Sequence, residues 1–337
     1  MPPRPSPVPP RRAALVAVVA LGAALLGCAP AAVAAEPASP AAAADAAAAA
    51  DASMSAPAAP PSRLVVTPEA AAAALAYWTP ERLAAATDRG KRADAPAPAL
   101  STAARPAAAT GSVATSAART AAGRGQHVAA VPHIGRLFGV DDVGGFSCSA
   151  NVVRSGNRST IATAGHCVSE HRYFATQLVF LPGYDSGESA LGSWPVVGGN
   201  VPTRWFARDE QDDDAAFLAV GRDAAGRDIQ SVTGASPVAF DAALVQRASG
   251  YGYPTGAPYD GETLIGCQGT TTADGPGKIG FLCDMTYGVS GGPLLIGGSP
   301  DGTQFSDLAD GDDLHCNGPA WQAAERSAYD LTAAIAT

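Results

Sequence analysis

Short apolar runs, each ended by a turn-forming residue, are the feature that most limits how residues 131–337 can fold. The runs are five to eight residues long and are bounded by Gly, Pro, Asn and Asp, which favour turns. Runs of this length and spacing predict an all-β sandwich or barrel. Helical signal is limited to the stretch from about Pro319 to Ile335. The clearest runs are Ser149–Val153, Ser159–Thr163, Gln177–Leu181, Ala215–Val220, Ala242–Ser249 and Gly292–Ile296.

Residues 1–130 have a different composition. Ala and Pro fill 67 of these 130 positions, 50 and 17 respectively, and no aromatic or β-branched pattern is sustained. Such a segment buries too little apolar surface to offset the entropy of ordering, which predicts a disordered Ala/Pro-rich N-terminal third. The remaining 207 residues are enough to build a core, and we expect them to form one domain, 131–337.

The charge of this expected domain excludes one class of partner. It carries 24 acidic and 11 basic residues, a net charge of −13, and has no basic patch. Nucleic acid is therefore not expected to bind. Outside the N-terminal segment no apolar run reaches the ~18 residues of a membrane helix, so no membrane span is predicted.

The first 35 residues have the pattern of an export signal. Three arginines precede the apolar run Ala13–Leu26, as in a secretory signal peptide. Two processing routes are open. Val33–Ala35 offers small residues to a general signal peptidase, whereas Leu25–Cys28 resembles a bacterial lipobox, in which Cys28 would carry lipid. Both routes place the mature protein outside the cytoplasm, where disulfides persist.

Residues 36–130 are expected to be a low-complexity linker and a pro-segment. Two short helices are predicted within them, at Thr67-Pro68-Glu69 and Thr79-Pro80-Glu81, because each triplet supplies an N-cap, a first-turn proline and an acid at the helix N-terminus. Tyr77 and Trp78 lie between the two triplets. Two interpretations stay open: a spacer with marginal helices, or a pro-segment that docks through Tyr77 and Trp78.

Three local motifs in residues 131–337 contain side chains suited to catalysis. His166 follows an apolar strand in Thr163–Cys167, and the acidic run Asp212–Asp214 leads directly into another apolar strand. Ser290 lies in Gly288–Pro293, where the glycines permit positive φ and a close approach of the backbone to a substrate. There the N–H groups of Gly288 and Ser290 could face a developing oxyanion.

The order of these motifs separates two kinds of serine hydrolase. Gly288 to Gly292 also fits the Gly-x-Ser-x-Gly nucleophile elbow of α/β-hydrolases. That fold needs an acid and then a histidine after the serine, and the only later histidine is His315, 25 residues on. The order His166, Asp214, Ser290 is instead the order of chymotrypsin-like peptidases.

The chain therefore resembles secreted trypsin-like serine peptidases of the chymotrypsin fold, in the bacterial branch that includes glutamyl-endopeptidase-like enzymes. The resemblance also covers an actinobacterial type of pro-region, at residues 77–82. It implies two packed six-stranded antiparallel β-barrels with a short C-terminal helix, activity on protein or peptide substrates, and no metal or organic cofactor. The matching motifs are Cys148–Ala150, Thr163–Cys167, Phe180–Tyr184, Asp214–Leu218, Gly250–Pro254, Cys283–Thr286 and Gly288–Pro293.

The resemblance also implies the role of each residue. His166 would be the general base, Asp214 the acid that orients it, with Asp213 as the second choice, and Ser290 the nucleophile. Gly288 and Ser290 would supply the oxyanion N–H groups. The disulfides Cys148–Cys167 and Cys267–Cys283 would form, leaving Cys316 without an assigned partner. We expect a secreted, extracellular monomer made as a zymogen.

Two features depart from the family pattern or leave the specificity open. The stretch 303–313, where relatives have a substrate-pairing strand, is acidic and poorly strand-like. A catalytically impaired, peptidase-like surface binding protein is therefore the alternative function. In the primary specificity pocket, Asp284 would favour a basic substrate residue, whereas Thr286 and His315 would favour an acidic one; a third interpretation is that Asp284 is a solvated loop acid outside the pocket. The sequence context slightly favours the acidic preference.

Overall fold

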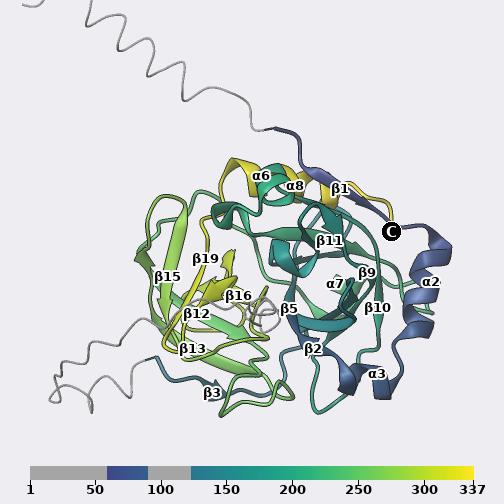
Figure 1. Cartoon of the computed structure of the whole chain (residues 1–337), viewed down its shortest axis with the longest axis horizontal. Coiled ribbons are helices and arrows are strands. Elements are labelled where there is room, and N and C mark those ends of the chain that lie inside the picture. Colours follow the sequence, from purple (N-terminus) through teal and green to yellow (C-terminus); the bar gives the residue numbers. More distant parts are fainter. Residues whose placement is uncertain (1–58, 90–122) are drawn as a thin grey trace, which may run out of the picture. The chain divides into compact units, whose positions relative to one another are not determined.

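A computed structural model describes residues 59–89 and 123–337 (Figure 1). All of these residues belong to one compact unit, Pro57–Thr337. The expected signal peptide, including Cys28, and most of the expected linker lie outside the described residues. Within the described ranges, no helix has the length and apolar character needed to cross a membrane.

The first half of the predicted peptidase domain is a closed six-stranded barrel, as expected. Its strands are antiparallel, and each apolar run places large side chains inside, among them Leu137, Phe146 and Leu218. The hydrogen-bonded order is β10-β11-β6-β5-β4-β9, and β9 pairs again with β10, Phe180 opposite Trp194. The strands are β4 (Ile134–Val140), β5 (Gly145–Val153), β6 (Thr160–Thr163), β9 (Thr176–Pro182), β10 (Trp194–Val201) and β11 (Ala216–Val220).

The second half has nine strands around a common core, hydrogen-bonded as two antiparallel sheets of five and four strands. One sheet has the order β17-β16-β12-β13-β3, and the other has the order β14-β15-β19-β18. Buried side chains from both sheets, including Cys267, Phe281 and Phe305, meet between them. The strands are β3 (Gln126–His127), β12 (Arg247–Gly252), β13 (Ile265–Thr270), β14 (Thr272–Ala273), β15 (Lys278–Leu282), β16 (Pro293–Ile296), β17 (Gln304–Asp307), β18 (Asp310–Gly311) and β19 (His315–Pro319).

The stretch 303–313 is more regular than its sequence suggests. It forms β17, which pairs with β16, and β18, which pairs with β19. Two buried polar residues of β17 have side-chain partners, although Asp307 Oδ2 has no hydrogen-bond partner among the described residues. The Trp321 indole N–H donates to Asp307 Oδ1 at 3.0 Å, and the Asn151 amide donates to Gln304 Oε1 at 2.8 Å.

Helices are few, and the predicted C-terminal helix is present as α8 (Ala323–Ala333). A capping box formed by Gln322 and Glu325 begins it, and its Thr332 hydroxyl donates to the Phe217 carbonyl of the first barrel. The other helices of residues 123–337 are α6 (Thr203–Arg208), α7 (Ile229–Thr233) and the 3₁₀ turns η1 (Gly165–Cys167) and η2 (Gln211–Asp213). A small hairpin is formed by β7 (Ser169–Glu170) and β8 (Tyr173–Phe174).

Residues 59–89 are ordered, although they lie inside the third that the sequence predicts to be disordered. β1 (Ser62–Val65) pairs antiparallel with β10, and β2 (Thr87–Asp88) pairs parallel with β5. Between them, α2 (Pro68–Tyr77) and α3 (Pro80–Ala85) begin at the predicted threonine N-caps, whose side chains accept backbone N–H groups. Figure 1 shows this segment against the first barrel.

Small and large side chains together dock this segment. Ala71 and Ala74 are buried on α2, where their short side chains let the helix pack against β9 and β10. Trp78 is 8% exposed, its indole N–H donates to the Gln177 carbonyl, and its ring centroid lies 5.4 Å from that of Phe138. The contact through Trp78 agrees with the second of the two interpretations that the sequence leaves open, and strands and alanines add to it.

Candidate active site

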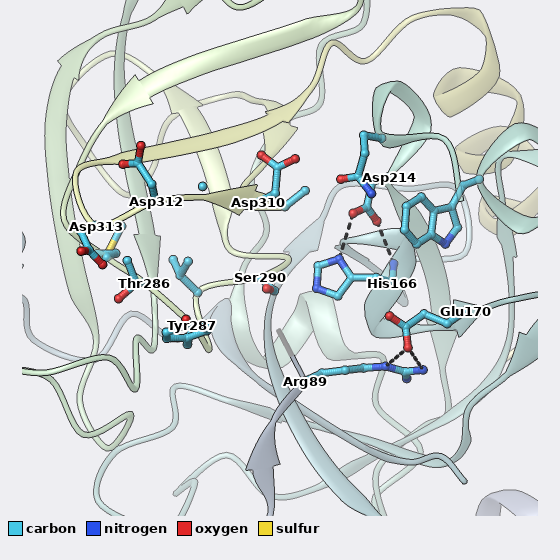
Figure 2. Close-up of a pocket in the computed structure, with 16 residues that line it drawn as sticks. Arg89, His166, Glu170, Asp214, Thr286, Tyr287, Ser290, Asp310, Asp312 and Asp313 are labelled. Atoms are coloured by element: carbon cyan, nitrogen blue, oxygen red, sulfur yellow. Dashed lines mark hydrogen bonds and ion pairs between the residues drawn. The ribbon is translucent and has the colours of Figure 1, made fainter. Parts of the chain in front are cut away.

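His166 and Asp214 are held together at the edge of the first barrel. His166 lies in η1, beside Cys167, which is disulfide-bonded to Cys148 in β5. Asp214 lies between η2 and β11. Its Oδ2 is 2.9 Å from His166 Nδ1, and its Oδ1 accepts the His166 backbone N–H at 2.7 Å. One buried carboxylate thus fixes both the ring and the backbone of the histidine (Figure 2).

The charge of Asp214 also sets the proton affinity of the imidazole. Burial lowers the pKa of His166, but the negative charge of Asp214 and the hydrogen bond to it act in the opposite direction, and the net pKa is raised. The other ring nitrogen, Nε2, is buried and has no hydrogen-bond partner in the described part of the chain. Ser290 lies next to this imidazole in the same pocket (Figure 2).

The loop that carries Ser290 has a backbone that only glycine fits at two positions. Gly288 has φ +74° and Gly291 has φ +80°, and an added Cβ would overlap the Tyr253 carbonyl at the first and the Thr163 hydroxyl at the second. Ser149 holds the loop from β5: its N–H donates to the Ser290 carbonyl at 2.7 Å and its hydroxyl donates to the Gly288 carbonyl at 2.8 Å. Within residues 59–89 and 123–337, the N–H groups of Gly288 and Ser290 have no acceptor.

A cavity of about 250 Å³ joins these groups. Acidic side chains dominate its charge, and Arg89 of the N-terminal segment is the one arginine among the described residues that line it. Beyond His166, Asp214 and Ser290, it is lined by Arg89, Glu170, Trp205, Gln211, Met285, Thr286, Tyr287, Val289, Ala309, Asp310, Gly311, Asp312 and Asp313.

The other members of the acidic run face elsewhere. Asp213 is buried but lies 3.7 Å from Arg204 rather than against His166, and burial raises its pKa. Neither Asp212 nor Asp213 lines the cavity. Of the three consecutive acids, Asp214 is therefore the one placed to orient His166.

Both expected disulfides, Cys148–Cys167 and Cys267–Cys283, are present. Cys316 is buried without a disulfide partner among the described residues, and burial raises its pKa to about 12. At neutral pH it is a thiol packed in the core rather than a reactive thiolate.

Solved structures of bacterial proteases share this fold. Protease Anisep from Arthrobacter nicotinovorans is 35% identical, with a TM-score of 0.60 over 63% of this chain and 100% of that one. The thermostable serine protease AL20 from an extremophilic microorganism is 38% identical, with a TM-score of 0.59 over 61% of this chain and 99% of that one. The chain belongs to the chymotrypsin-fold serine peptidases.

A third solved peptidase, a Glu endopeptidase, shares the fold at 18% identity, with a TM-score of 0.52 over 64% of this chain and 98% of that one. No protein-family model matches the chain. No curated protein matches it either.

In this serine peptidase the three residues predicted for the specificity pocket are separated. Asp284 does not line the cavity; its Oδ1 accepts the Gly125 N–H at 2.7 Å and lies 2.9 Å from the Tyr259 hydroxyl. Thr286 does line it. His315 is exposed, does not line it, and has its Nδ1 3.1 Å from Asp312 Oδ1.

Sequence analysis missed the residues that the peptidase draws from distant segments. Arg89 directly follows β2, lines the cavity and is 4% exposed, with its guanidinium 3.2 Å from Glu170 and 4.2 Å above the Phe146 ring. Trp205 packs edge-on against His166 with ring centroids 6.3 Å apart. No local motif marks these side chains, since only tertiary contacts bring them to the site.

Proposed function

We propose that this serine peptidase is a secreted endopeptidase that hydrolyses peptide bonds through an acyl-enzyme formed on Ser290. His166 Nε2 removes the proton from the Ser290 hydroxyl, and Oγ attacks the carbonyl carbon of the scissile bond. Asp214 holds the tautomer in which Nδ1 carries a proton, and its charge stabilises the imidazolium that forms.

The same groups complete the reaction. The developing oxyanion accepts hydrogen bonds from the N–H groups of Gly288 and Ser290. The imidazolium then gives its proton to the leaving amine, which departs and leaves the acyl-enzyme. Water, deprotonated in turn by His166, hydrolyses the ester and restores Ser290.

The paired contact between Asp214 and His166, beside a serine in the same cavity, carries this proposal. A fluorophosphonate probe should label Ser290 in the wild-type protein and leave Ser290→Ala unlabelled, with both proteins folded. If the probe does not label the mature wild-type protein, whose cavity is open, the result would favour the alternative function, a surface binding protein without catalysis. The regular strands formed by residues 304–307 and 310–311 support the catalytic function over that alternative.

The acidic cavity supports a substrate with a basic residue before the scissile bond. Asp310 is paired with Lys278 at 2.6 Å and Asp312 with His315 at 3.1 Å, whereas Asp313 makes no ion pair among the described residues. A substrate carboxylate at this edge would be repelled, and a guanidinium would gain charge-assisted hydrogen bonds. The proposal reverses the slight preference for acidic substrates that the sequence suggests.

We further propose that the protein is made as a zymogen in which residues 59–89 block the cavity. Arg89 lines the cavity together with His166 and Ser290, and Asp88 Oδ2 lies 3.0 Å from the position that a Cβ on Gly288 would occupy. A peptide of residues 59–89, added to the mature enzyme, should inhibit it competitively. The same peptide with Trp78→Ala should inhibit far less, because it lacks the buried anchor; equal potency would contradict docking at this site.

A further inference from the structure

The side chain of Arg89 is seated against three groups of the peptidase domain. Its Nε and Nη2 donate to Glu170 Oε2 at 3.4 Å and 3.2 Å, and its Nε lies 3.7 Å from Asp141 Oδ2. The guanidinium lies over the ring of Phe146, 4.2 Å from the ring centroid. Because Arg89 is buried, its charge depends on these two carboxylates and this ring rather than on water.

The position of Glu170 is set by contacts within the peptidase domain. Glu170 ends β7 of the small hairpin, and Asp209 fixes the turn that follows it. Asp209 accepts the His171 backbone N–H at 3.1 Å and lies 3.0 Å from His171 Nδ1. The Trp205 indole N–H holds the start of the hairpin by donating to the Ser169 carbonyl at 3.0 Å. The Glu170 carboxylate is therefore held beside the cavity independently of the docked N-terminal segment.

Asp141 and Phe146 are held in the same way. Asp141 Oδ1 accepts the backbone N–H groups of Val143 and Gly144, both at 2.9 Å, which orients its carboxylate. Phe146 lies in β5 and packs in the core of the first barrel. Neither residue lines the cavity with Arg89 in place. Removal of Arg89 would therefore open a preformed site of two carboxylates and an aromatic ring.

The proposed reaction determines which part of a substrate would reach this site. The imidazolium of His166 gives its proton to the leaving amine, so the leaving group lies on the side of Ser290 that His166 occupies. Glu170 comes only four residues after His166. Figure 2 shows Glu170 and Arg89 on this side, with Thr286 on the other side of Ser290. The groups around Arg89 thus face the leaving-group half of a bound substrate.

We propose that Glu170, Asp141 and Phe146 form an arginine site of the mature enzyme, which binds a substrate arginine in the first two positions after the scissile bond. This inference rests on the proposed function and concerns a different substrate residue from the one placed near Asp313. Arginine is preferred to lysine here. A planar guanidinium lies flat over the ring while two of its nitrogens donate to one carboxylate, and an ammonium does not do both.

The test compares arginine with citrulline, which has nearly the same shape but no charge. Mature enzyme from expression of the full chain is assayed with internally quenched peptides that differ only at the first or the second position after the scissile bond. At one of these positions, kcat/KM should be roughly tenfold higher for arginine than for citrulline, as for charge-assisted hydrogen bonds to a partly desolvated carboxylate. Lysine should recover only part of this difference.

Two variants assign the preference to the arginine site. Glu170→Gln keeps the size of the side chain but should lower the arginine-to-citrulline ratio to about twofold. The charge of Glu170 also raises the pKa of His166, but that effect acts on both peptides and cancels in the ratio. Asp142→Asn is the matched control, because Asp142 is the exposed neighbour of Asp141 and does not line the cavity. It should keep the wild-type ratio.

A wild-type ratio near one at both positions would overturn the proposal, as would a ratio that Glu170→Gln leaves unchanged. If Glu170→Gln does not fold, Asp141→Asn replaces it and should lower the ratio about threefold. If mass measurement finds residues 59–89 still bound, the ratio is measured on full-length Arg89→Ala, in which the arginine site is empty.

Fluorophosphonate labelling of the same protein separates this proposal from the proposed function. Labelled Ser290 without a preference for arginine over citrulline overturns the arginine site alone. Folded mature protein that is not labelled overturns the proposed catalysis, and the arginine site falls with it.

Discussion

Replacing Asp214 by asparagine tests the proposed catalytic geometry with the smallest change of shape. Asp214 accepts two hydrogen bonds from His166, at 2.7 Å from the backbone N–H and at 2.9 Å from Nδ1. An asparagine has a single oxygen. If that oxygen keeps the backbone N–H, its amide N–H₂ group faces Nδ1, which must then accept, and the proton moves to Nε2, on the side of Ser290.

The size of the effect follows from that tautomer. With a proton on Nε2, His166 cannot take one from Ser290, and the imidazolium also loses its buried counter-charge. The corresponding substitution in a triad of this kind lowers kcat by about 10⁴-fold, equivalent to about 5 kcal/mol of transition-state stabilisation. We therefore expect Asp214→Asn to lose about four orders of magnitude in kcat.

The pH dependence gives a second signature. In the wild type, burial lowers the pKa of His166 but Asp214 and Glu170 together raise it by more, so activity falls as pH drops through this raised pKa. Without the charge of Asp214, burial still lowers the pKa of His166 and Glu170 still raises it; burial is the larger of these two effects, so the pKa falls. The acid limb of the residual activity should therefore move to lower pH.

Asp213→Asn is the matched control, since Asp213 is the adjacent carboxylate in the sequence and is turned toward Arg204. Its kcat should stay within about threefold of wild type, as for substitutions away from the reacting groups. The assay is peptide hydrolysis by mature enzyme, with active sites counted by burst titration. An Asp214→Asn variant within tenfold of wild type, or an Asp213→Asn variant as damaged as Asp214→Asn, would refute the assignment.

Three further predictions concern docking, specificity and backbone strain. Trp78→Ala should destabilise the docked segment 59–89 by about 3 kcal/mol, read as faster hydrogen exchange in β1 and β2 of the full chain; unchanged exchange would contradict a buried anchor. Peptides with Arg before the scissile bond should be cleaved faster than peptides with Glu there, and Asp313→Asn should lower the ratio of these two cleavage rates roughly threefold. Faster cleavage after Glu would contradict the proposed acidic pocket. Gly291→Ala should unfold at a lower denaturant concentration than Gly187→Ala, because both positions have positive φ but only the Cβ added at Gly291 would overlap neighbouring atoms. Equal unfolding midpoints would show that the loop around Ser290 adjusts to the added Cβ.

The fold and the catalytic motifs could be predicted because their signals are local. Each strand of the first barrel is a short apolar run, and the glycines around Ser290 occupy positions with positive φ at Gly288 and Gly291. The choice of Asp214 over Asp213 needed only the register of the following strand, β11. Such features depend on neighbours within a few residues, which a sequence displays directly.

The rest depends on contacts between distant segments. Alanine-rich composition predicts flexibility for residues 59–89, yet Ala71 and Ala74 pack closely on the barrel because they are small. Asp284 was placed in the specificity pocket by its distance along the chain from Ser290, but the Gly125 N–H and Tyr259 hydroxyl draw its carboxylate elsewhere. Neither outcome follows from the residue types alone.

One charge links the proposed latency to the proposed specificity. Among the described residues that line the cavity, the permanent positive charge comes from Arg89, which belongs to the docked N-terminal segment, whereas Glu170, Asp214, Asp310, Asp312 and Asp313 belong to the peptidase domain. In the proposed zymogen, Arg89 pairs with Glu170 and so supplies a cation among these acids. Once residues 59–89 leave, the same carboxylates remain without it, and the field in the cavity becomes more negative. A basic substrate side chain can then take the place of Arg89 beside these carboxylates. The side chain proposed to keep the enzyme latent and the substrate side chain that the mature enzyme is proposed to prefer are therefore both cationic.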